Sequence, residues 1–433
     1  MHTIGIRYED KYVMERRVAL VPEHIKELIG KGLKFEVVSS AKRIFKDEEF
    51  EEVGAELVNE VSDSSVIIGV KEMPIDFFED RKTYIFFSHT IKGQSYNMPL
   101  LRQMMAKNVN LIEYERIVNE KNQRLIFFGR FAGLAGMINS FWSVGQRWKE
   151  LGVLTPFLEL KQTHKYNSLD EAKEAIAKVA AEIKNGGLPC ELEPMVVGLT
   201  GYGNASKGAQ EILDMFPVKE VSPEELPTIF SEGHKPDSLI YKVVFKEKDL
   251  SEPLDSDKKF VLQEYYDHPE LFKSKFEQYI PHMTILMNCM YWDDKYPRIV
   301  TKDYLEDLYE KGNPKLVVIG DITCDPNGSI ECTYKGTEIE DPVFVYDPFT
   351  RKPTMGFKGD GILIMAVDIL PSELPRESSQ TFSDALIDFM PEIAAADFNV
   401  AFDELKLPYP IKRALILHNG KLTPEYQYLK KYI

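Results

Sequence analysis

Two residues that can exchange a proton near neutral pH follow two neighbouring apolar runs early in the chain. Lys71 comes directly after Val66–Val70, and His89 comes shortly after Tyr84–Phe87. Both runs are short and rich in β-branched and aromatic residues, which predicts buried strands. Ligands of open α/β sheets bind beyond the carboxyl ends of such strands. We therefore hypothesise that Lys71 and His89 project into one crevice and that this crevice is a catalytic site; the alternative for each is a solvated strand end.

Charged residues suited to carboxylate or amine substrates flank this stretch. Arg16 and Arg17 follow the first predicted strand, and a guanidinium group can hold a carboxylate through two parallel hydrogen bonds. Glu113 and Glu115 lie at the end of the run Asn110–Tyr114. Each of these groups has a plain alternative, a surface pair or a solvated strand end, and the sequence leaves both interpretations open.

A glycine-rich turn later in the chain has the context of a dinucleotide site. The predicted strand Met195–Leu199 leads into TGYGNASKG, and a helix is predicted over Ala209–Met215. Gly201 permits a tight turn, and Gly203 lets the backbone approach a pyrophosphate at the helix N-terminus. Ser206 stands at the third glycine position of the fingerprint, so a structural turn is the alternative.

Alternating strand and helix patterns surround both features. The predicted strands are Thr3–Ile6, Lys34–Val38, Val66–Val70, Tyr84–Phe87, Asn110–Tyr114, Leu239–Val244, Thr284–Met287, Lys315–Ile319 and Ala414–Leu417. The uninterrupted apolar run Gly361–Val367 is typical of a strand buried on both faces. Early helical patterns cover Pro22–Gly30 and Glu48–Val61. This alternation predicts parallel sheets covered by helices on both faces.

Two later helices carry packing and capping signals. Small residues recur from Gly129 to Gly136, and a glycine inside a helix costs up to about 1 kcal/mol, so we expect a close helix–helix contact there. The helix Ser168–Lys184 begins with a capping box between Ser168 and Glu171. We expect this second helix to connect two domains.

Bulk composition excludes several classes of protein. The 433 residues suggest two or three domains, and the net charge of −16 argues against a nucleic-acid partner. The four cysteines form no C-x-x-C pair, which argues against a metal site or disulfides. No apolar run reaches the roughly 18 residues of a membrane span. Because a strand is predicted almost at Met1, we expect no targeting peptide and a cytoplasmic location.

Several motifs together resemble a known family. The run ERRVALVP resembles the opening motif of the alanine dehydrogenase, transhydrogenase and saccharopine dehydrogenase superfamily. FGRFAGLAGMIN, GYGNASKGAQEI, MNCMYWDDKYPRIVT, GDITCDPNGSIE and DILPSELPRESSQTFSDAL resemble, in the same order, the lysine–2-oxoglutarate reductase half of the bifunctional enzyme of lysine breakdown. The resemblance runs from Ile4 to Tyr426. Because the chain ends at Ile433, we expect a free-standing reductase without the saccharopine dehydrogenase half.

The resemblance implies both an activity and roles for particular residues. The activity is condensation of L-lysine with 2-oxoglutarate and reduction of the resulting imine by NADPH to saccharopine. Lys71 and His89 would be the acid–base pair, Arg17 and Gln94 would hold substrate carboxylates, and Glu115 would sit near the substrate amine. The residues expected to bind the cofactor are Gly201, Gly203, Asn204, Ser222 and Asp368.

The predicted fold class is α/β, with two Rossmann-like, doubly wound parallel-sheet domains around a central cleft. Residues 1–130 with 371–433 would form the catalytic domain, and residues 131–370 the dinucleotide-binding domain. This discontinuous layout is what the resemblance implies.

Two other functions and the choice of cofactor stay open at this point. The chain could be an NAD-dependent, lysine-forming saccharopine dehydrogenase, or a catalytically silent relative that binds lysine or a nucleotide. The predicted strand Pro217–Val221 places Ser222 at the cofactor ribose, with Lys219 near; an end one residue earlier would place Glu220 there and favour NAD(H). The resemblance favours NADP(H). The candidate protein partners are a second copy of the chain and a separate saccharopine dehydrogenase.

Overall fold

The computed structural model describes residues 2–61, 63–230, 237–312 and 314–433. The chain divides into two compact units, which are described separately. Unit 1 consists of Met1–Phe128 and Pro375–Ile433, and unit 2 consists of Gly129–Leu374.

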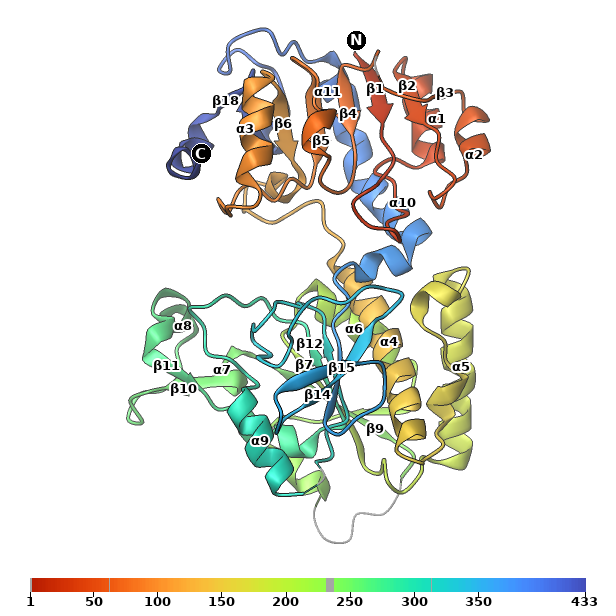
Figure 1. Ribbon diagram of the computed structural model, residues 1–433, viewed down its shortest axis with the longest axis vertical. Helices are drawn as coiled ribbons and strands as arrows, with labels where there is room; N and C mark the ends of the chain where they lie inside the picture. The colour runs from red at the N-terminus through yellow and green to blue at the C-terminus, as the bar shows by residue number, and fades with distance from the viewer. Residues whose placement is uncertain (1, 62, 231–236, 313) are drawn as a thin grey trace. The chain divides into compact units, whose positions relative to one another are not determined.

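Unit 1 is built on an eight-stranded sheet of order β18-β17-β6-β5-β4-β1-β2-β3 (Figure 1). The strands are β1 (Thr3–Ile6), β2 (Lys34–Val38), β3 (Glu56–Val58), β4 (Val66–Ile68), β5 (Thr83–Phe86), β6 (Asn110–Glu113), β17 (Leu415–His418) and β18 (Lys421–Leu422). β1 to β6 are parallel, and β17 and β18 run antiparallel at one edge. The parallel part confirms the fold class predicted for the start of the chain.

Helices from both ends of the sequence cover this sheet. They are α1 (Pro22–Gly30), α2 (Asp47–Glu51), α3 (Met98–Ala106), α10 (Pro375–Leu386), α11 (Met390–Ala395) and α12 (Tyr409–Ala414). Phe382 and Leu386 of α10 belong to the same buried core as Ile4 of β1 and Ile67 of β4. The C-terminal segment therefore completes the hydrophobic core of unit 1.

The helix predicted over Glu48–Val61 is wrong. α2 ends at Glu51, and Gly54 adopts a φ of +94°, which favours glycine and turns the chain back. The residues that follow form β3, which pairs in parallel with β2 at the edge of the sheet. A short helix and a short edge strand together resemble one longer helical pattern in sequence.

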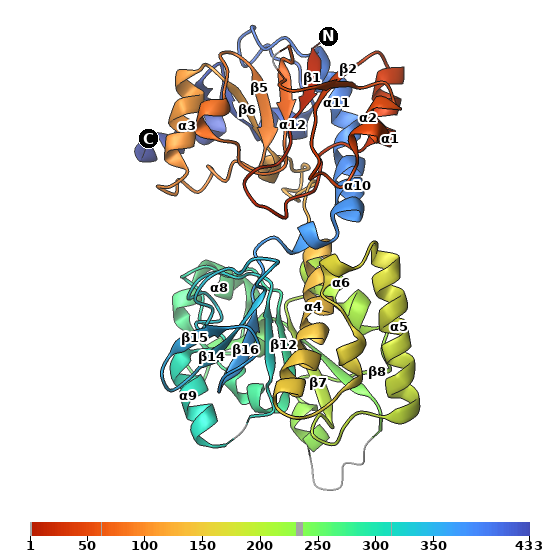
Figure 2. The same cartoon turned by 45° about the vertical axis from the view of Figure 1, so that its right-hand side comes forward.

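Unit 2 contains a second eight-stranded sheet of order β15-β14-β16-β13-β12-β7-β9-β8 (Figure 2). Its strands are β7 (Met195–Thr200), β8 (Val218–Glu220), β9 (Ile240–Phe245), β12 (Ile285–Asn288), β13 (Val318–Asp321), β14 (Val343–Asp347), β15 (Lys352–Met355) and β16 (Ile362–Met365). β14 is antiparallel to both its neighbours, and the other pairs are parallel. All four residues of β16 are buried, as the apolar run around it predicts.

Helices lie on both faces of this sheet. The main ones are α4 (Gly129–Glu150), α5 (Leu169–Gly186), α6 (Asn204–Leu213), α7 (Glu247–Leu250), α8 (Leu262–Asp267) and α9 (Lys302–Glu310). β10 (Ser251–Pro253) and β11 (Phe272–Ser274) form a separate two-stranded antiparallel sheet. In β13, a side chain at Gly320 would meet Ser140 of α4, whereas Ile319 shares a core with Leu305 of α9. Successive strand residues face opposite sides, so α4 and α9 cover opposite faces (Figure 2).

The expected close helix contact is confirmed, and the partner of α4 is α6. A Cβ atom at Gly133 would lie 1.9 Å from the carbonyl oxygen of Ala205, and one at Gly208 would lie 2.0 Å from that of Arg130. Each helix thus needs a glycine where the other helix's backbone passes. This contact fixes α6, whose first turn carries the glycine-rich motif.

Two further features bear on the expectations from sequence. α5 lies within unit 2, so the prediction that this helix connects two domains is wrong. Its N-cap is confirmed at Ser168, whose hydroxyl accepts the backbone N–H of Glu171, but the return bond differs from the predicted capping box, because the Glu171 carboxylate accepts the backbone N–H of Asn167. Among the described residues no helix has the length and apolar character needed to cross a bilayer.

Candidate active site

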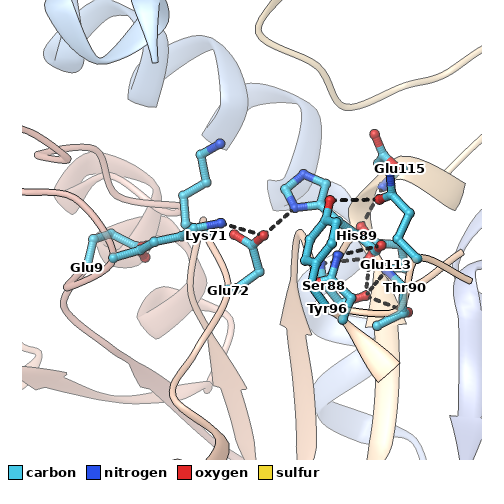
Figure 3. Close-up of polar contacts among 12 residues, drawn as sticks. Glu9, Lys71, Glu72, Ser88, His89, Thr90, Tyr96, Glu113 and Glu115 are labelled. Carbon is cyan, nitrogen blue, oxygen red and sulfur yellow. Dashed lines mark hydrogen bonds and ion pairs between the residues drawn. The ribbon is translucent and has the colours of Figure 1, made fainter. Parts of the chain in front are cut away.

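Lys71 and His89 lie at the carboxyl ends of adjacent parallel strands of unit 1. β4 ends at Ile68 and β5 at Phe86, so each residue lies three positions beyond its strand. The two strands pair in parallel, with Ile68 opposite Ile85. Figure 3 shows both side chains extending to the same side, beyond the strand ends. The two residues therefore lie at the same edge of the sheet, and their catalytic role stays a prediction.

A carboxylate orients the imidazole. Oε1 of Glu72 lies 2.7 Å from Nδ1 of His89 and 2.6 Å from Nζ of Lys11. Burial raises the pKa of Glu72, but the hydrogen bonds and charges of His89 and Lys11 outweigh it and lower the pKa to about 2. Glu72 is therefore ionised at neutral pH and holds Nδ1 of His89. The other ring nitrogen, Nε2, faces away from Glu72 and is the one that can exchange a proton with a substrate.

The backbone of His89 adopts a conformation that side chains rarely favour. Its φ is +51°, in the left-handed region, which costs of order 1 kcal/mol or more. Nδ2 of Asn97 donates to the carbonyl oxygen of His89 at 3.0 Å and fixes this turn. Such strain persists only where surrounding contacts hold it, and here it sets the direction of the imidazole.

Two buried carboxylates lie beneath the loops that carry the pair. Glu9 accepts the backbone N–H of Val70 at 2.6 Å and that of Lys71 at 2.9 Å, one on each oxygen. Glu113, the last residue of β6, accepts the backbone N–H of Ser88 at 2.7 Å and also binds its hydroxyl. Burial raises the pKa of both carboxyls to about 7.

The structure pairs Arg17 with a carboxylate of the protein itself. Nε and Nη2 of Arg17 donate to the two oxygens of Glu15 at 2.7 and 2.6 Å, and both residues are buried. The guanidinium carbon lies 4.1 Å from the centre of the Phe128 ring. Arg16 instead donates to the carbonyl of Lys42 at 3.4 Å. Of the two arginines, Arg17 is thus the one held rigidly, and its predicted contact with substrate stays a prediction.

The two other residues predicted to bind substrate, Gln94 and Glu115, are less buried than Arg17. Gln94 is exposed and accepts the hydroxyl of Tyr96 at 2.8 Å. Glu115 is half-buried, with Nη1 of Arg124 at 3.5 Å from its Oε1. Figure 3 shows Glu115 on the opposite side of His89 from Lys71.

The glycine-rich turn of unit 2 borders a pocket of about 290 Å³. Gly201 has a φ of +78°, and Gly203 is the N-cap of α6, which begins at Asn204 rather than at Ala209 as predicted. The free N–H groups of this first turn suit a phosphate group. The pocket is lined by Gly201, Tyr202, Gly203, Glu247, Leu250, Tyr265, Tyr266, Cys289, Met290, Tyr291 and Tyr296. These features fit a nucleotide whose pyrophosphate approaches the backbone of the turn.

The strand order corrects the residue count behind the Ser222 prediction. β9, not β8, is the parallel neighbour of β7, and β8 lies at the sheet edge. Glu220 ends β8 opposite Lys242, to which it pairs at 2.9 Å, three residues short of the end of β9. The hydroxyl of Ser222 accepts the backbone N–H of Glu225 at 3.3 Å. Neither Ser222 nor Glu220 lines the pocket at the glycine turn.

Two charged residues lie at the end of β9, the strand next to β7. The residue count had assigned this position to the end of β8. Lys246 and Glu247 follow β9 directly, and the backbone N–H of Gly201 donates to the carbonyl of Phe245 beside them at 2.9 Å. Glu247 lines the pocket and accepts the hydroxyl of Tyr266 at 2.7 Å. Nζ of Lys246 lies 6.0 Å from the centre of the Tyr202 ring. In the sequence, Lys246 and Glu247 could have been found from the second apolar run after the glycine-rich turn, because this run forms β9.

Asp368 is not brought together with the glycine turn. It follows β16, which β13 and β12 separate from β7, and its Oδ1 lies 3.8 Å from Sγ of Cys324. Within the described ranges no group of three or more His, Cys, Asp or Glu residues is arranged to hold a metal ion. Sequence reasoning also missed Glu9 and Glu72, although both follow strands at the same edge as Lys71.

Comparison with known proteins places this geometry in a family. The description "Alanine dehydrogenase/PNT, N-terminal domain" matches residues 5–135, and "Alanine dehydrogenase/PNT, C-terminal domain" matches residues 271–425. Among solved structures, an L-alanine dehydrogenase superposes with a TM-score of 0.62 at 16% identity over 99% of both chains. A transhydrogenase from Sinorhizobium meliloti superposes with a TM-score of 0.53 at 13% identity over 97% of this chain and 100% of that one.

Curated relatives are similar along the whole chain. Alpha-aminoadipic semialdehyde synthase of Arabidopsis thaliana is 38% identical over 99% of this chain and 41% of its own length, and the mitochondrial mouse protein of that name is 34% identical over 99% and 47%. The chain thus spans less than half of these relatives. Saccharopine dehydrogenase [NAD(+), L-lysine-forming] of Yarrowia lipolytica is 27% identical over 91% of this chain and 93% of its own. Together these matches show that the chain belongs to the alanine dehydrogenase/PNT family, with aminoadipic semialdehyde synthases among its homologues.

Proposed function

We propose that this protein catalyses the reductive condensation of L-lysine with 2-oxoglutarate to saccharopine. The observation that carries the proposal is the paired placement of Lys71 and His89, three residues beyond two adjacent parallel strands. The similarity to aminoadipic semialdehyde synthases along 99% of the chain supports it. Homology to oxidoreductases of the saccharopine pathway fits a chain that carries an acid–base pair in one unit and a nucleotide-binding fold in the other.

The chemistry requires an acid and a base in turn. The lysine ε-amine must be neutral to attack the ketone of 2-oxoglutarate, so a base takes its proton as the C–N bond forms. An acid then protonates the hydroxyl of the addition product, which leaves as water and gives the protonated imine, whose carbon can accept a hydride to form the secondary amine. Nε2 of His89 and Nζ of Lys71 are the groups that exchange these protons, while Glu72 keeps the imidazole oriented.

A reduced nicotinamide dinucleotide, when bound, supplies the hydride that reduces the imine carbon. The backbone of Gly201 and Gly203 and the first turn of α6 would hold its pyrophosphate. Glu247 and Lys246, at the end of the strand next to β7, would lie at its adenosine ribose. The substrates carry carboxylates, for which Arg17 and Gln94 are the proposed partners.

We propose NADPH as the hydride donor, on the family resemblance, with the Lys246 ammonium as the partner of its 2′-phosphate. One observation favours NADH: the Glu247 carboxylate lines the pocket, where it would accept a ribose hydroxyl and repel a phosphate. Lys246→Ala should lower the ratio of kcat/KM for NADPH to that for NADH, and Glu247→Gln should raise it. If the wild-type protein prefers NADH, Glu247 rather than Lys246 would be the residue that determines which cofactor binds.

A preference for NADH would also strengthen the second candidate function, the NAD-dependent, lysine-forming saccharopine dehydrogenase. The Yarrowia lipolytica relative of that name supports this alternative. The two candidates are told apart by comparing kcat/KM for saccharopine oxidation with NAD⁺ and for lysine condensation with NADPH. A silent, binding-only relative would show neither rate.

The cytoplasmic location stays a prediction; the mouse relative's name gives a mitochondrial location for that protein.

The direct test is to follow cofactor oxidation at 340 nm with each substrate alone and with both together. Oxidation should occur only when lysine and 2-oxoglutarate are both present. Oxidation with pyruvate and ammonia, but not with lysine, would instead favour an alanine dehydrogenase activity.

A further inference from the structure

Two buried carboxylates of unit 1 have no role in the reaction just described, yet each binds one of the loops that carry the acid–base pair. Glu9 lies in the loop after β1, and Glu113 ends β6. β4 and β5, the strands that lead to Lys71 and His89, lie between β1 and β6 in the sheet. The pair is therefore flanked on both sides by a carboxylate that points at backbone.

Glu9 holds the loop of Lys71 with both of its oxygens. Oε1 accepts the N–H of Val70 at 2.6 Å, and Oε2 accepts that of Lys71 at 2.9 Å. A Cβ atom at Gly69 would lie 3.2 Å from Oε1 of Glu9, so the absence of a side chain there lets the carboxylate approach. Glu9 is 5% exposed and is fixed within the core of the unit.

Glu113 holds the loop of His89 in the same manner. Its Oε2 accepts the N–H of Ser88 at 2.7 Å and the hydroxyl of the same residue, and its Oε1 accepts the N–H of Glu115 at 3.1 Å. Asn97 binds the carbonyl oxygen of His89, so the strained peptide is held from both ends. Figure 3 shows Glu113 beside Ser88, with the His89 ring above.

Both carboxylates are costly to bury, which argues that their contacts are specific. Burial is the main cause that raises the pKa of each to about 7. Glu15 raises the pKa of Glu9 further and Arg7 lowers it, while Glu115 raises that of Glu113. Burying a carboxylate costs free energy unless hydrogen bonds satisfy its oxygens, so the N–H groups that Glu9 and Glu113 bind offset part of this cost.

We propose that Glu9 and Glu113 are a pair of positioning residues, Glu9 acting through Lys71 and Glu113 acting through His89. Each fixes the main chain at the point where the side chain of the acid–base pair leaves the strand. Neither carboxylate contacts the reacting atoms, because each is buried beneath its loop. This inference rests on the proposed function only in naming Lys71 and His89 as the groups that are positioned.

The test replaces each carboxylate with its isosteric amide. Glu9→Gln sets an NH₂ group against one of two N–H donors, so the Lys71 loop should shift and kcat should fall about 10- to 100-fold, the range for a small misplacement. The KM values and nucleotide Kd should change less than threefold. Glu36 provides the control: it is also buried, in β2, and accepts the Ser64 hydroxyl at 2.6 Å. Glu36→Gln should leave kcat unchanged even where it lowers stability.

Double variants separate positioning from a general structural effect. In a Lys71→Met background, Glu9→Gln should have no further effect on the residual rate, whereas Glu113→Gln should still lower it. In a His89→Gln background, Glu113→Gln should have no further effect on the residual rate, whereas Glu9→Gln should still lower it. Additive losses in all four combinations would overturn the assignment of each carboxylate to one partner. Full turnover of Lys71→Met alone would count against the proposed function instead.

Amide hydrogen exchange tests the holding contacts without any turnover. In the wild-type protein the amides of Val70, Lys71 and Ser88 should be strongly protected although they lie beyond the ends of their strands. Glu9→Gln should speed exchange at Val70 and Lys71 but not at Ser88, and Glu113→Gln should speed it at Ser88 and Glu115 but not at Val70 or Lys71. Wild-type exchange at these amides as fast as in an open loop would overturn the proposal, even if a variant fails to fold.

Discussion

Replacing Glu72 by glutamine removes the carboxylate that joins Lys11 to His89. The pKa of Glu72 is lowered from its ordinary 4.5 to about 2, because the contacts from His89 and Lys11 outweigh burial. A carboxyl group whose pKa is lower in the folded than in the unfolded protein stabilises the fold at pH values above the unfolded pKa, about 4.5 for Glu72. This stabilisation is lost as the pH falls from about 4.5 through 2. The difference corresponds to about 3 kcal/mol at neutral pH. The side chain is 12% exposed, so solvent screening is limited.

The prediction is checked by urea denaturation of the wild type and Glu72→Gln at pH 7 and pH 3. The free energy of unfolding should differ by up to about 3 kcal/mol at pH 7, and by about half of that at pH 3. Glu27→Gln is the control, since Glu27 forms an exposed pair with Lys31 and should change little at either pH. A difference for Glu72→Gln that is equal at both pH values, or larger at pH 3, would refute the reasoning.

Four further variants, one of them with a matched control, test the acid–base pair, the buried Arg17 pair and the contact between α4 and α6. Lys71→Met and His89→Gln should each lower kcat about 10²-fold or more and leave the nucleotide Kd unchanged in a binding titration, and near wild-type turnover in both would contradict their role. Arg17→Ala should destabilise the protein by about 3–5 kcal/mol in urea, because it strands a buried carboxylate, and an unchanged midpoint would count against the buried pair. Gly133→Ala should lower the free energy of unfolding by about 1–3 kcal/mol, because its Cβ would meet the backbone of α6. Gly30→Ala is the control and should not lower it, since a Cβ there meets nothing within 4 Å. Equal effects of the two substitutions would contradict the close helix contact.

Much of the fold could be predicted from the sequence because strand signals are local. β1, β2 and α1 have the predicted bounds, and the ends of β4, β5 and β6 differ from prediction by one or two residues. The same local signals placed Lys71 and His89 at strand ends. That part of the site depends only on the strands being parallel and adjacent, which the βαβ alternation itself implies.

The rest depends on contacts between distant residues. Counting along the chain placed Ser222 at the ribose because β8 is the next strand after β7, yet β9 is inserted between them in space. Glu9 lies 61 positions before Val70 in sequence, so no local pattern links them. The start of α6 was missed because Ser206 and Gly208 are residues typical of loops. Gly208 instead lies inside the helix, where the backbone of α4 leaves no room for a side chain.

The rate of NADPH oxidation by the purified protein distinguishes a lysine–2-oxoglutarate reductase from the alternatives. NADPH oxidation should require L-lysine and 2-oxoglutarate together, should yield saccharopine in equal amount to the NADP⁺ formed, and should fall about 10²-fold in the Lys71→Met variant. No oxidation of either reduced cofactor with both substrates present, or equal oxidation when lysine is omitted, would contradict the account.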